Sequence, residues 1–255
     1  MRLIVRSVLF NVLFYLNLFL HFIIALPTLV MPRWGIVGVV RWWARTNIWL
    51  LRALCDIKVE FRGLTKRPPG ALLVASKHQS FWETFALMLV FPDPAYILKR
   101  ELIFIPFFGW YAWKSRMIPV DRGKGSQALA AMTDYARVEL QRGRQIVIFP
   151  EGTRRAPGAE PRYKYGVVRL YAETGVPCLP VALNSGLFWP RRSFRRFPGT
   201  IRVELLDPIM PGLDKEAFFE RLQQAIETAT ARLVAEGERE LADQGIKASS
   251  LVPSP

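Results

Sequence analysis

The chain has 255 residues, a length that suits one α/β domain with an appendage. Apolar residues make up 51% of it, and 35 basic against 21 acidic side chains give a formal net charge of +14. This charge predicts an anionic partner: a phospholipid surface, a phosphorylated substrate or nucleic acid. The two cysteines, Cys55 and Cys178, are too few for a disulfide scaffold, and their neighbours show no metal-ligand spacing.

The first segment is apolar and long. Residues 7–31 contain no Asp, Glu, Lys or Arg, and a helix of that length, at about 1.5 Å per residue, reaches across a hydrocarbon core of about 30 Å. Arg2 and Arg6 precede the run and Arg33 follows it, so both flanks are basic and neither fixes an orientation. A cleaved signal peptide is the alternative, but the apolar region is long for one and no A-x-A-like site follows it closely.

The next segment, residues 34–55, combines tryptophans with Arg41, Arg45 and Arg52, which share one helical face. Arginine and tryptophan on an apolar helix are typical of a membrane interface. We therefore expect residues 1–55 to form a membrane-associated helical hairpin, with one helix dipping into the bilayer and the second at its surface. Both ends then face the cytoplasm, which predicts a location on the cytoplasmic face of the inner or plasma membrane.

From about residue 56 the pattern becomes that of an α/β domain, which we expect to extend to residue 240 and to end in a flexible tail over 241–255. Short apolar or alternating runs predict strands at 57–61, 71–76, 95–99, 116–120, 144–149, 178–183 and 200–206. Amphipathic runs predict helices at 81–91, 125–143, 165–175 and 213–237. Alternating strands and helices predict the α/β fold class, with a mixed sheet covered by helices.

A histidine follows the second predicted strand. His78 stands directly after the apolar run, and Glu83 lies in the first turn of the following helix. A carboxylate that holds one imidazole nitrogen fixes the tautomer and stabilises the imidazolium, which suits a general base. The alternative is structural: Ser80 and Glu83 also form the S-x-x-E capping box, in which Glu83 accepts from the Ser80 N–H. A carboxylate has two oxygens, so the two roles do not exclude each other.

A turn after the strand at 144–149 supplies phosphate-binding chemistry. It reads Glu151, Gly152, Thr153, Arg154. Glycine permits a tight turn with exposed backbone N–H groups, and arginine offers a planar fork that fits a phosphate. Chemistry in α/β sheets gathers at the carboxyl ends of strands, so we expect this turn to meet His78.

These motifs resemble those of the 1-acylglycerol-3-phosphate acyltransferases, a glycerolipid acyltransferase family. Four blocks occur in the family's order: HQSFWE at 78–83, a block at 99–122, FPEGTR at 149–154 and VPCLPVAL at 176–183. The resemblance in the second and fourth blocks rests on Lys99, Pro106, Gly109, Asp121, Arg122, Pro177 and Pro180. In the first block Glu83 stands where the family usually has Asp, which puts the geometry of the carboxylate in doubt.

The resemblance implies acyl transfer from acyl-CoA or an acyl-carrier protein to lysophosphatidic acid at a phospholipid membrane. His78 and Glu83 are the expected catalytic residues. The expected substrate-binding residues are Glu151, Gly152, Thr153, Arg154, Arg122, Lys99 and Lys164. We expect no metal and no cofactor.

Two alternatives remain open at this stage. The first is the same reaction on glycerol-3-phosphate or another lysophospholipid, which the motifs do not distinguish. The second is a non-catalytic basic protein that binds membranes or nucleic acid; no nucleic-acid module occurs in the sequence, which argues against a nucleic-acid partner. The basic segment 191–196 is either a lipid contact, a docking patch for an acyl carrier or a solvated loop.

Overall fold

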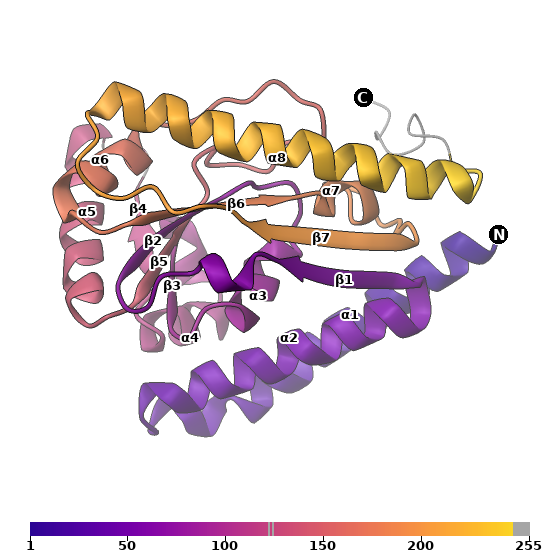
Figure 1. The fold of residues 1–255 in the computed structure, drawn as a ribbon. Helices are drawn as coiled ribbons and strands as arrows, with labels where there is room; N and C mark the ends of the chain where they lie inside the picture. The colour runs from indigo at the N-terminus through magenta and orange to yellow at the C-terminus, as the bar shows by residue number, and fades with distance from the viewer. Residues whose placement is uncertain (122, 124, 247–255) are drawn as a thin grey trace.

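The computed structural model describes residues 1–121, 123 and 125–246. A central sheet of seven described strands is covered by helices, and a long helical hairpin lies along one side (Figure 1). The strands are β1 Ile57–Arg62, β2 Leu72–Ser76, β3 Pro94–Lys99, β4 Ile118–Val120, β5 Gln145–Ile148, β6 Cys178–Leu183 and β7 Gly199–Leu205. The predicted α/β class with a mixed sheet is confirmed.

The strand order is β1-β7-β6-β2-β5-β3-β4. The five strands from β6 to β4 are parallel, whereas β7 runs antiparallel to β6 and pairs in parallel with β1. Strand β2 therefore lies between β6 and β5, and the three strands end at the same edge of the sheet. Loops that follow these strands meet there, which is where ligands bind in such sheets.

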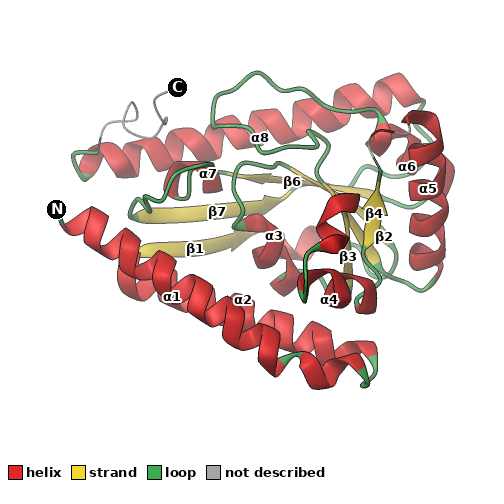
Figure 2. Ribbon diagram, turned by 180° about the vertical axis from the view of Figure 1, so that it is seen from behind, coloured by secondary structure: helices red, strands yellow, loops and turns green. Residues whose placement is uncertain are grey.

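Helices cover both faces of the sheet. They are α1 Arg2–Ile24, α2 Arg33–Cys55, α3 Glu83–Ala86, α4 Phe108–Lys114, α5 Gly125–Gln141, α6 Gly166–Thr174, α7 Ser185–Phe188 and α8 Lys215–Asp243. Short 3-10 turns occur at Leu26–Leu29, Leu64–Lys66, Leu87–Leu89 and Arg100–Phe104. The α1–α2 hairpin lies on one side of the sheet and α8 on the other (Figure 2).

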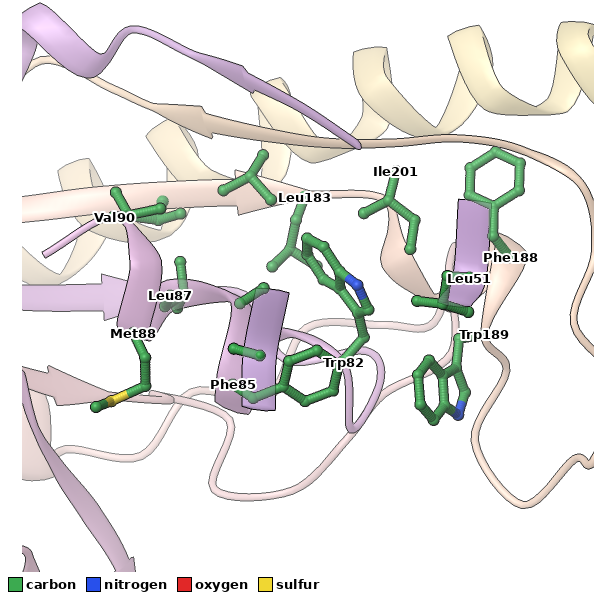
Figure 3. Packing of buried hydrophobic residues seen from close by; sticks show 14 of the residues in the cluster. Leu51, Trp82, Phe85, Leu87, Met88, Val90, Leu183, Phe188, Trp189 and Ile201 are labelled. Atoms are coloured by element: carbon green, nitrogen blue, oxygen red, sulfur yellow. The ribbon is translucent and has the colours of Figure 1, made fainter. Parts of the chain in front are cut away.

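The alternation of side chains along β2 divides the core into two parts. Leu72 and Val74 point into a cluster shared with the hairpin and α3, whereas Leu73 and Ala75 join a cluster with α5, α6 and α8. Figure 3 shows the first cluster, in which Trp82 lies among aliphatic side chains and is fully buried. Burying each large apolar side chain contributes about 1.5–3 kcal/mol, so both helical layers are stabilised through the sheet.

The predicted hairpin is present, and α1 is long and apolar enough to cross a membrane, which suggests membrane association. The expectation that one face of α2 presents all its arginines to the interface is wrong for Arg41. Its guanidinium donates to the carbonyls of Met88 at 3.1 Å and Phe91 at 2.8 Å. Arg45 and Arg52 remain exposed. Arg41 therefore ties the hairpin to the α/β domain.

The predicted helix at 81–91 is shorter than expected. Only Glu83–Ala86 is α-helical, and a 3-10 turn follows at Leu87–Leu89. At the end of this segment, Arg41 donates a hydrogen bond to the Met88 carbonyl and Arg67 donates one to the Val90 carbonyl. Side chains from α2 and from the loop before β2 thus satisfy backbone groups that a continuing helix would have paired internally.

The last helix is longer than predicted. It begins at the cap residue Asp214, whose side chain accepts from the Ala217 N–H at 2.8 Å, and it continues through Gly237 to Asp243. A side chain at Gly237 would lie 2.6 Å from Leu187, so this glycine permits close packing and does not end the helix. Leu241 is buried in the core. The helix therefore continues past residue 240, where the sequence predicted that the domain ends and a flexible tail begins, and residues 247–255 lie outside the described part.

Candidate active site

Three neighbouring strands bring the candidate site together. His78 follows β2, Glu151 follows β5, and Ser185 follows β6. The order β6-β2-β5 places the histidine loop between the other two loops. Gly186 lies where these loops meet, since an added Cβ would be 2.9 Å from both Gln79 and Pro157. The close approach of the three loops requires glycine at this position.

Glu83 is fully buried and accepts four hydrogen bonds. Its Oε1 lies 2.8 Å from His78 Nδ1 and accepts from the backbone N–H groups of Gln79 and Ser80, each at 2.7 Å. Its Oε2 accepts from the Ser185 hydroxyl at 2.7 Å. Both contacts considered from the sequence are therefore present, because one oxygen accepts from the Ser80 N–H and also contacts the imidazole. Glutamate reaches all of these partners from the first residue of α3.

These contacts determine the tautomer of His78. Oε1 already accepts from two backbone N–H groups, so it faces His78 Nδ1 as an acceptor, and Nδ1 carries the proton. Nε2 is then the unprotonated nitrogen, which is able to accept a proton. The imidazole also stacks on Phe149, with ring centroids 4.0 Å apart, which holds the ring plane. The side chain is only 14% exposed, so one edge reaches solvent.

The predicted turn at 151–154 lies against the histidine, as the sequence indicated. The Arg155 N–H donates to the His78 carbonyl at 2.8 Å, and Glu151 Oε2 accepts from the His78 N–H at 3.1 Å. Gly152 has a φ of +65°, which a side chain rarely adopts, and a Cβ there would meet the Lys164 side chain at 3.2 Å. Gly152 and Lys164 are thus adjacent in space.

Glu151 belongs to a buried ion-pair network that the sequence did not reveal. Lys77 Nζ lies 2.9 Å from Glu151 and 2.7 Å from Glu227 of α8, and the Tyr163 hydroxyl donates to Glu227 at 2.8 Å. Burial raises the pKa of Glu151, and Lys77 opposes that shift. The network holds Glu151 against the His78 backbone and connects the candidate site to the C-terminal helix.

The basic segment 191–196 is divided between two environments. Arg191 donates to the Arg154 carbonyl at 2.7 Å, and burial together with the charges of Arg192, Arg154 and Arg155 lowers the pKa of its guanidinium. Arg196 is turned inward, 4.2 Å from the Trp189 ring, and burial lowers its pKa to about 10. The six residues therefore do not form one continuous surface patch: Arg191 backs the 151–154 turn, whereas Arg196 is a core residue.

The remaining candidate substrate-binding residues that the structure describes lie at or near the surface. Arg154 is half-buried, and Thr153 and Lys164 are exposed beside the turn. Lys99 ends β3 and pairs with Glu101 at 3.2 Å, on a partly exposed surface. Arg122 lies outside the described residues. No group of three possible metal ligands occurs within the described residues.

Sequence reasoning missed three residues that shape the site. Ser185 holds the second oxygen of Glu83, Phe149 supports the imidazole, and Lys77 holds Glu151. Phe149 begins the FPEGTR block and Lys77 directly precedes His78, so their position was a usable signal. Ser185 follows a strand with no motif residue beyond it, and only the strand order brings it to Glu83.

A histidine is held by a carboxylate with a basic turn beside it, and the sequence has no G-x-S-x-G nucleophile elbow; this arrangement on an α/β sheet is the kind that general-base acyl transfer requires. The Acyltransferase family model matches residues 58–184. The chain is 38% identical to the 1-acyl-sn-glycerol-3-phosphate acyltransferase of Pseudomonas aeruginosa over 81% of this chain and 80% of that protein. It is 30% identical to the human 1-acyl-sn-glycerol-3-phosphate acyltransferase alpha, over 73% and 69% of the two chains.

The fold also matches a solved structure. The crystal structure of the 1-acyl-sn-glycerophosphate acyltransferase from Thermotoga maritima superimposes with a TM-score of 0.73 at 22% identity, covering 91% of this chain and 99% of that one. At this identity the structural likeness concerns the fold. With the sequence relatives above, the chain belongs to the 1-acyl-sn-glycerol-3-phosphate acyltransferase family.

Proposed function

We propose that this protein transfers a fatty acyl group from an acyl thioester to the sn-2 hydroxyl of 1-acylglycerol-3-phosphate, which gives phosphatidic acid. The observation that carries the proposal is the pairing of His78 Nδ1 with the buried Glu83 carboxylate, directly beside the turn that contains Arg154. The family relationship supports the same reaction.

The chemistry needs no enzyme nucleophile, because a thioester is already activated. His78 Nε2 takes the proton of the sn-2 hydroxyl while the oxygen attacks the thioester carbonyl carbon. The tetrahedral intermediate then expels the thiolate as the C–S bond breaks, and the imidazolium returns its proton to the sulfur. Glu83 stabilises the imidazolium between these steps. General-base assistance of this kind contributes about 10²–10⁴-fold in rate.

We assign the acceptor's phosphate to the basic turn. Arg154 carries the guanidinium, and Gly152 lets the backbone approach an anion. The lowered pKa of the Arg191 guanidinium supports this, since it reflects both burial and an excess of positive charge around the turn. A bound phosphate relieves that repulsion. Lys164 is adjacent to Gly152 and completes the site.

The membrane attachment follows from how α1 meets the domain. Near its start, Ser7 accepts from the Arg196 N–H at 2.9 Å, and Arg196 also donates to Asn11 at 2.7 Å. At its end, the Phe22 carbonyl accepts from Tyr111 of α4. A helix docked along its whole length cannot cross a bilayer without taking the domain with it. We therefore propose that the hairpin lies in one leaflet, with the exposed apolar face of α1 among the acyl chains.

This placement brings the lipid phase to the catalytic loop. Phe14 of α1 lies 6.1 Å, between ring centroids, from Phe81, which follows His78 in the loop before α3. An acceptor with its acyl chain in the leaflet can therefore present its hydroxyl without drawing the chain into water, at a saving of roughly 0.8 kcal/mol per CH₂ group. The excess of basic side chains supports the anionic cytoplasmic face as the location.

A panel of acceptors and donors tests the function directly. Purified full-length protein in mixed micelles is given lysophosphatidic acid, a lysophospholipid with a blocked phosphate, or glycerol-3-phosphate, each with acyl-CoA or an acyl-carrier protein thioester. We expect transfer to lysophosphatidic acid to be the most efficient. No transfer to lysophosphatidic acid with either donor overturns the proposal. A preference for glycerol-3-phosphate makes that molecule the acceptor in place of lysophosphatidic acid.

Two variants test the assigned roles. His78→Ala is expected to lower kcat by at least about 10³-fold with membrane binding intact. Arg154→Ala is expected to raise the KM for the phosphate-bearing acceptor and leave the KM for the thioester unchanged. Arg162→Ala is the matched control, because this arginine lies in the same loop and is largely exposed. Equal effects at positions 154 and 162 contradict a specific phosphate contact.

A further inference from the structure

Five large apolar side chains are exposed on a short segment outside the catalytic site. They belong to the 3-10 turn before α4, to the connection and to α4 itself: Phe104, Ile105, Phe108, Trp110 and Trp113. We refer to these five residues as the aromatic platform. Their exposed fractions range from 37% to 78%, and such a concentration of exposed apolar side chains indicates a contact surface.

The opposite side of α4 is fixed to the helical hairpin. Tyr111 donates to the Phe22 carbonyl at the end of α1, and Lys114 Nζ donates to the Leu29 carbonyl in the connection to α2 at 2.8 Å. Phe107 stacks on Phe22, with ring centroids 5.8 Å apart. Figure 2 shows α4 beside the end of the hairpin that carries this connection. The platform is therefore next to the part of the chain that we place in the membrane.

The backbone that presents the platform is tightly constrained. Phe107 has a φ of +62°, an unfavourable conformation for a residue with a side chain. At Gly109 a Cβ would lie 1.8 Å from the Ile103 carbonyl oxygen, so only glycine fits where the two turns cross. Strained backbone of this kind occurs mainly at functional sites, so we take the exposure of these aromatic side chains to serve a function.

We propose that the aromatic platform inserts into the same membrane leaflet as α1 and forms a second point of attachment. The occupant is a phospholipid bilayer, and the argument is continuity. The exposed apolar residues of α1, the exposed Val30 of the connection and the platform are joined by the contacts of Tyr111 and Lys114. Tryptophan is also the side chain that best suits the boundary between headgroups and acyl chains. This inference rests on the proposed membrane attachment of the hairpin.

Two separated points of attachment restrict the orientation of the domain on the membrane more than one point does. A single hairpin leaves the domain free to rotate about the hairpin axis. A platform held at the end of that hairpin fixes the remaining angle, and with it the height of His78 above the leaflet. The platform thereby keeps the site at the level where the hydroxyl of a membrane-resident acceptor lies.

Spin labels measure the insertion directly. Both native cysteines are buried, so an introduced exposed cysteine is labelled selectively. We would prepare Trp113→Cys in the platform, Leu16→Cys on the exposed face of α1 and Met210→Cys in the connection before α8, on the side of the sheet away from the hairpin. Each full-length variant is labelled with a nitroxide and reconstituted into vesicles of phosphatidylcholine and phosphatidylglycerol. Accessibility to oxygen and to a water-soluble nickel chelate then reports depth.

The expected result is that the labels at 113 and 16 are accessible to oxygen and protected from nickel, whereas the label at 210 is open to nickel. A label at 113 as open to nickel as the one at 210, with 16 protected, overturns the platform proposal and leaves the hairpin in the membrane. If the labels at positions 113 and 16 are both accessible to nickel, the insertion of the platform and the membrane attachment of the hairpin are both wrong. Spin–spin broadening at 113 without nickel protection assigns the platform to self-association and also overturns its insertion.

A functional readout follows from the same geometry. The double variant Trp110→Ser with Trp113→Ser is expected to lower the vesicle partition coefficient at least about tenfold. Its turnover of a short-chain, water-soluble acceptor is expected to match that of the unaltered protein, whereas its turnover of a vesicle-borne acceptor falls. Met210→Ser is the control for loss of an exposed apolar side chain. Unchanged partition of the double variant contradicts the proposal.

Discussion

Replacing Glu83 by glutamine separates the two roles of its carboxylate. Oε1 meets two backbone N–H groups, from Gln79 and Ser80, and these require an oxygen at that position. In Glu83→Gln the amide oxygen therefore keeps this place and still accepts from His78 Nδ1. The amide nitrogen takes the place of Oε2 and donates to Ser185, whose hydroxyl turns to accept. The tautomer and the packing are preserved, and only the negative charge is lost.

The magnitude follows from the bond that remains. A hydrogen bond to a charged group contributes about 1.5–3 kcal/mol, against about 0.5–1.5 kcal/mol for a neutral one. The midpoints of the two ranges differ by about 1.25 kcal/mol, and this difference acts when the imidazole becomes an imidazolium, which corresponds to about eightfold in kcat. We expect kcat to fall by that factor, with the KM for the acceptor and the thermal stability little changed.

The assay is thiol release from an acyl thioester with lysophosphatidic acid as acceptor, followed over a range of acceptor concentrations. Glu60→Gln is the control, because Glu60 pairs with Arg62 on β1, far along the sheet from β2. A kcat within twofold of the unaltered protein means that the charge is not used. A loss above about 10³-fold means that the backbone N–H groups do not hold the tautomer, and either result refutes the reasoning.

Three further predictions concern stability. Lys77→Met leaves the buried Glu151 and the partly buried Glu227 without their cationic partner and is expected to lower the free energy of unfolding by about 3–5 kcal/mol in denaturant titrations; a loss below about 1 kcal/mol contradicts the network. Ser185→Ala removes one hydrogen bond to a carboxylate and should cost about 1.5–3 kcal/mol in the same measurement, with kcat reduced less than tenfold. For Asp93, burial raises the pKa, but Arg33 and Arg144 outweigh it and lower the pKa below its ordinary value. This carboxylate therefore stabilises the fold above about pH 4 and loses its contribution as the pH falls further, so Asp93→Asn should flatten the acid limb of a stability-against-pH curve.

Local patterns in the chain determined much of the site. His78 and Glu83 are five residues apart, so a single turn brings them together whatever the rest of the fold does. The meeting of His78 with the turn at 151–154 was predictable because both follow apolar strands, and parallel strands deliver their loops to the same edge. The exchange of Asp for Glu at position 83, which put the geometry in doubt, still leaves the carboxylate 2.8 Å from the imidazole.

The uncharged run and the basic residues around it also indicated where the hairpin lies in the chain, but not which side of it meets the protein. In α1 almost every residue is apolar, so the sequence offered no contrast between a face for lipid and a face for the domain. The contact face is set by Ser7 and Asn11, whose partner Arg196 lies far along the chain. The same holds for Arg41, which carries the charge of an interfacial residue but finds carbonyl partners in the domain.

The sequence by itself determined the fold class, the histidine with its carboxylate, the basic turn and the apolar hairpin, because each depends on residues that are close in the chain. The tertiary structure alone decided the order of the strands, and so placed Ser185 on Glu83 across 102 positions and Lys77 between Glu151 and Glu227. Pairing between strands depends on backbone hydrogen bonds that all residues except proline offer alike, so side-chain patterns indicate that a strand exists but not which strand lies beside it.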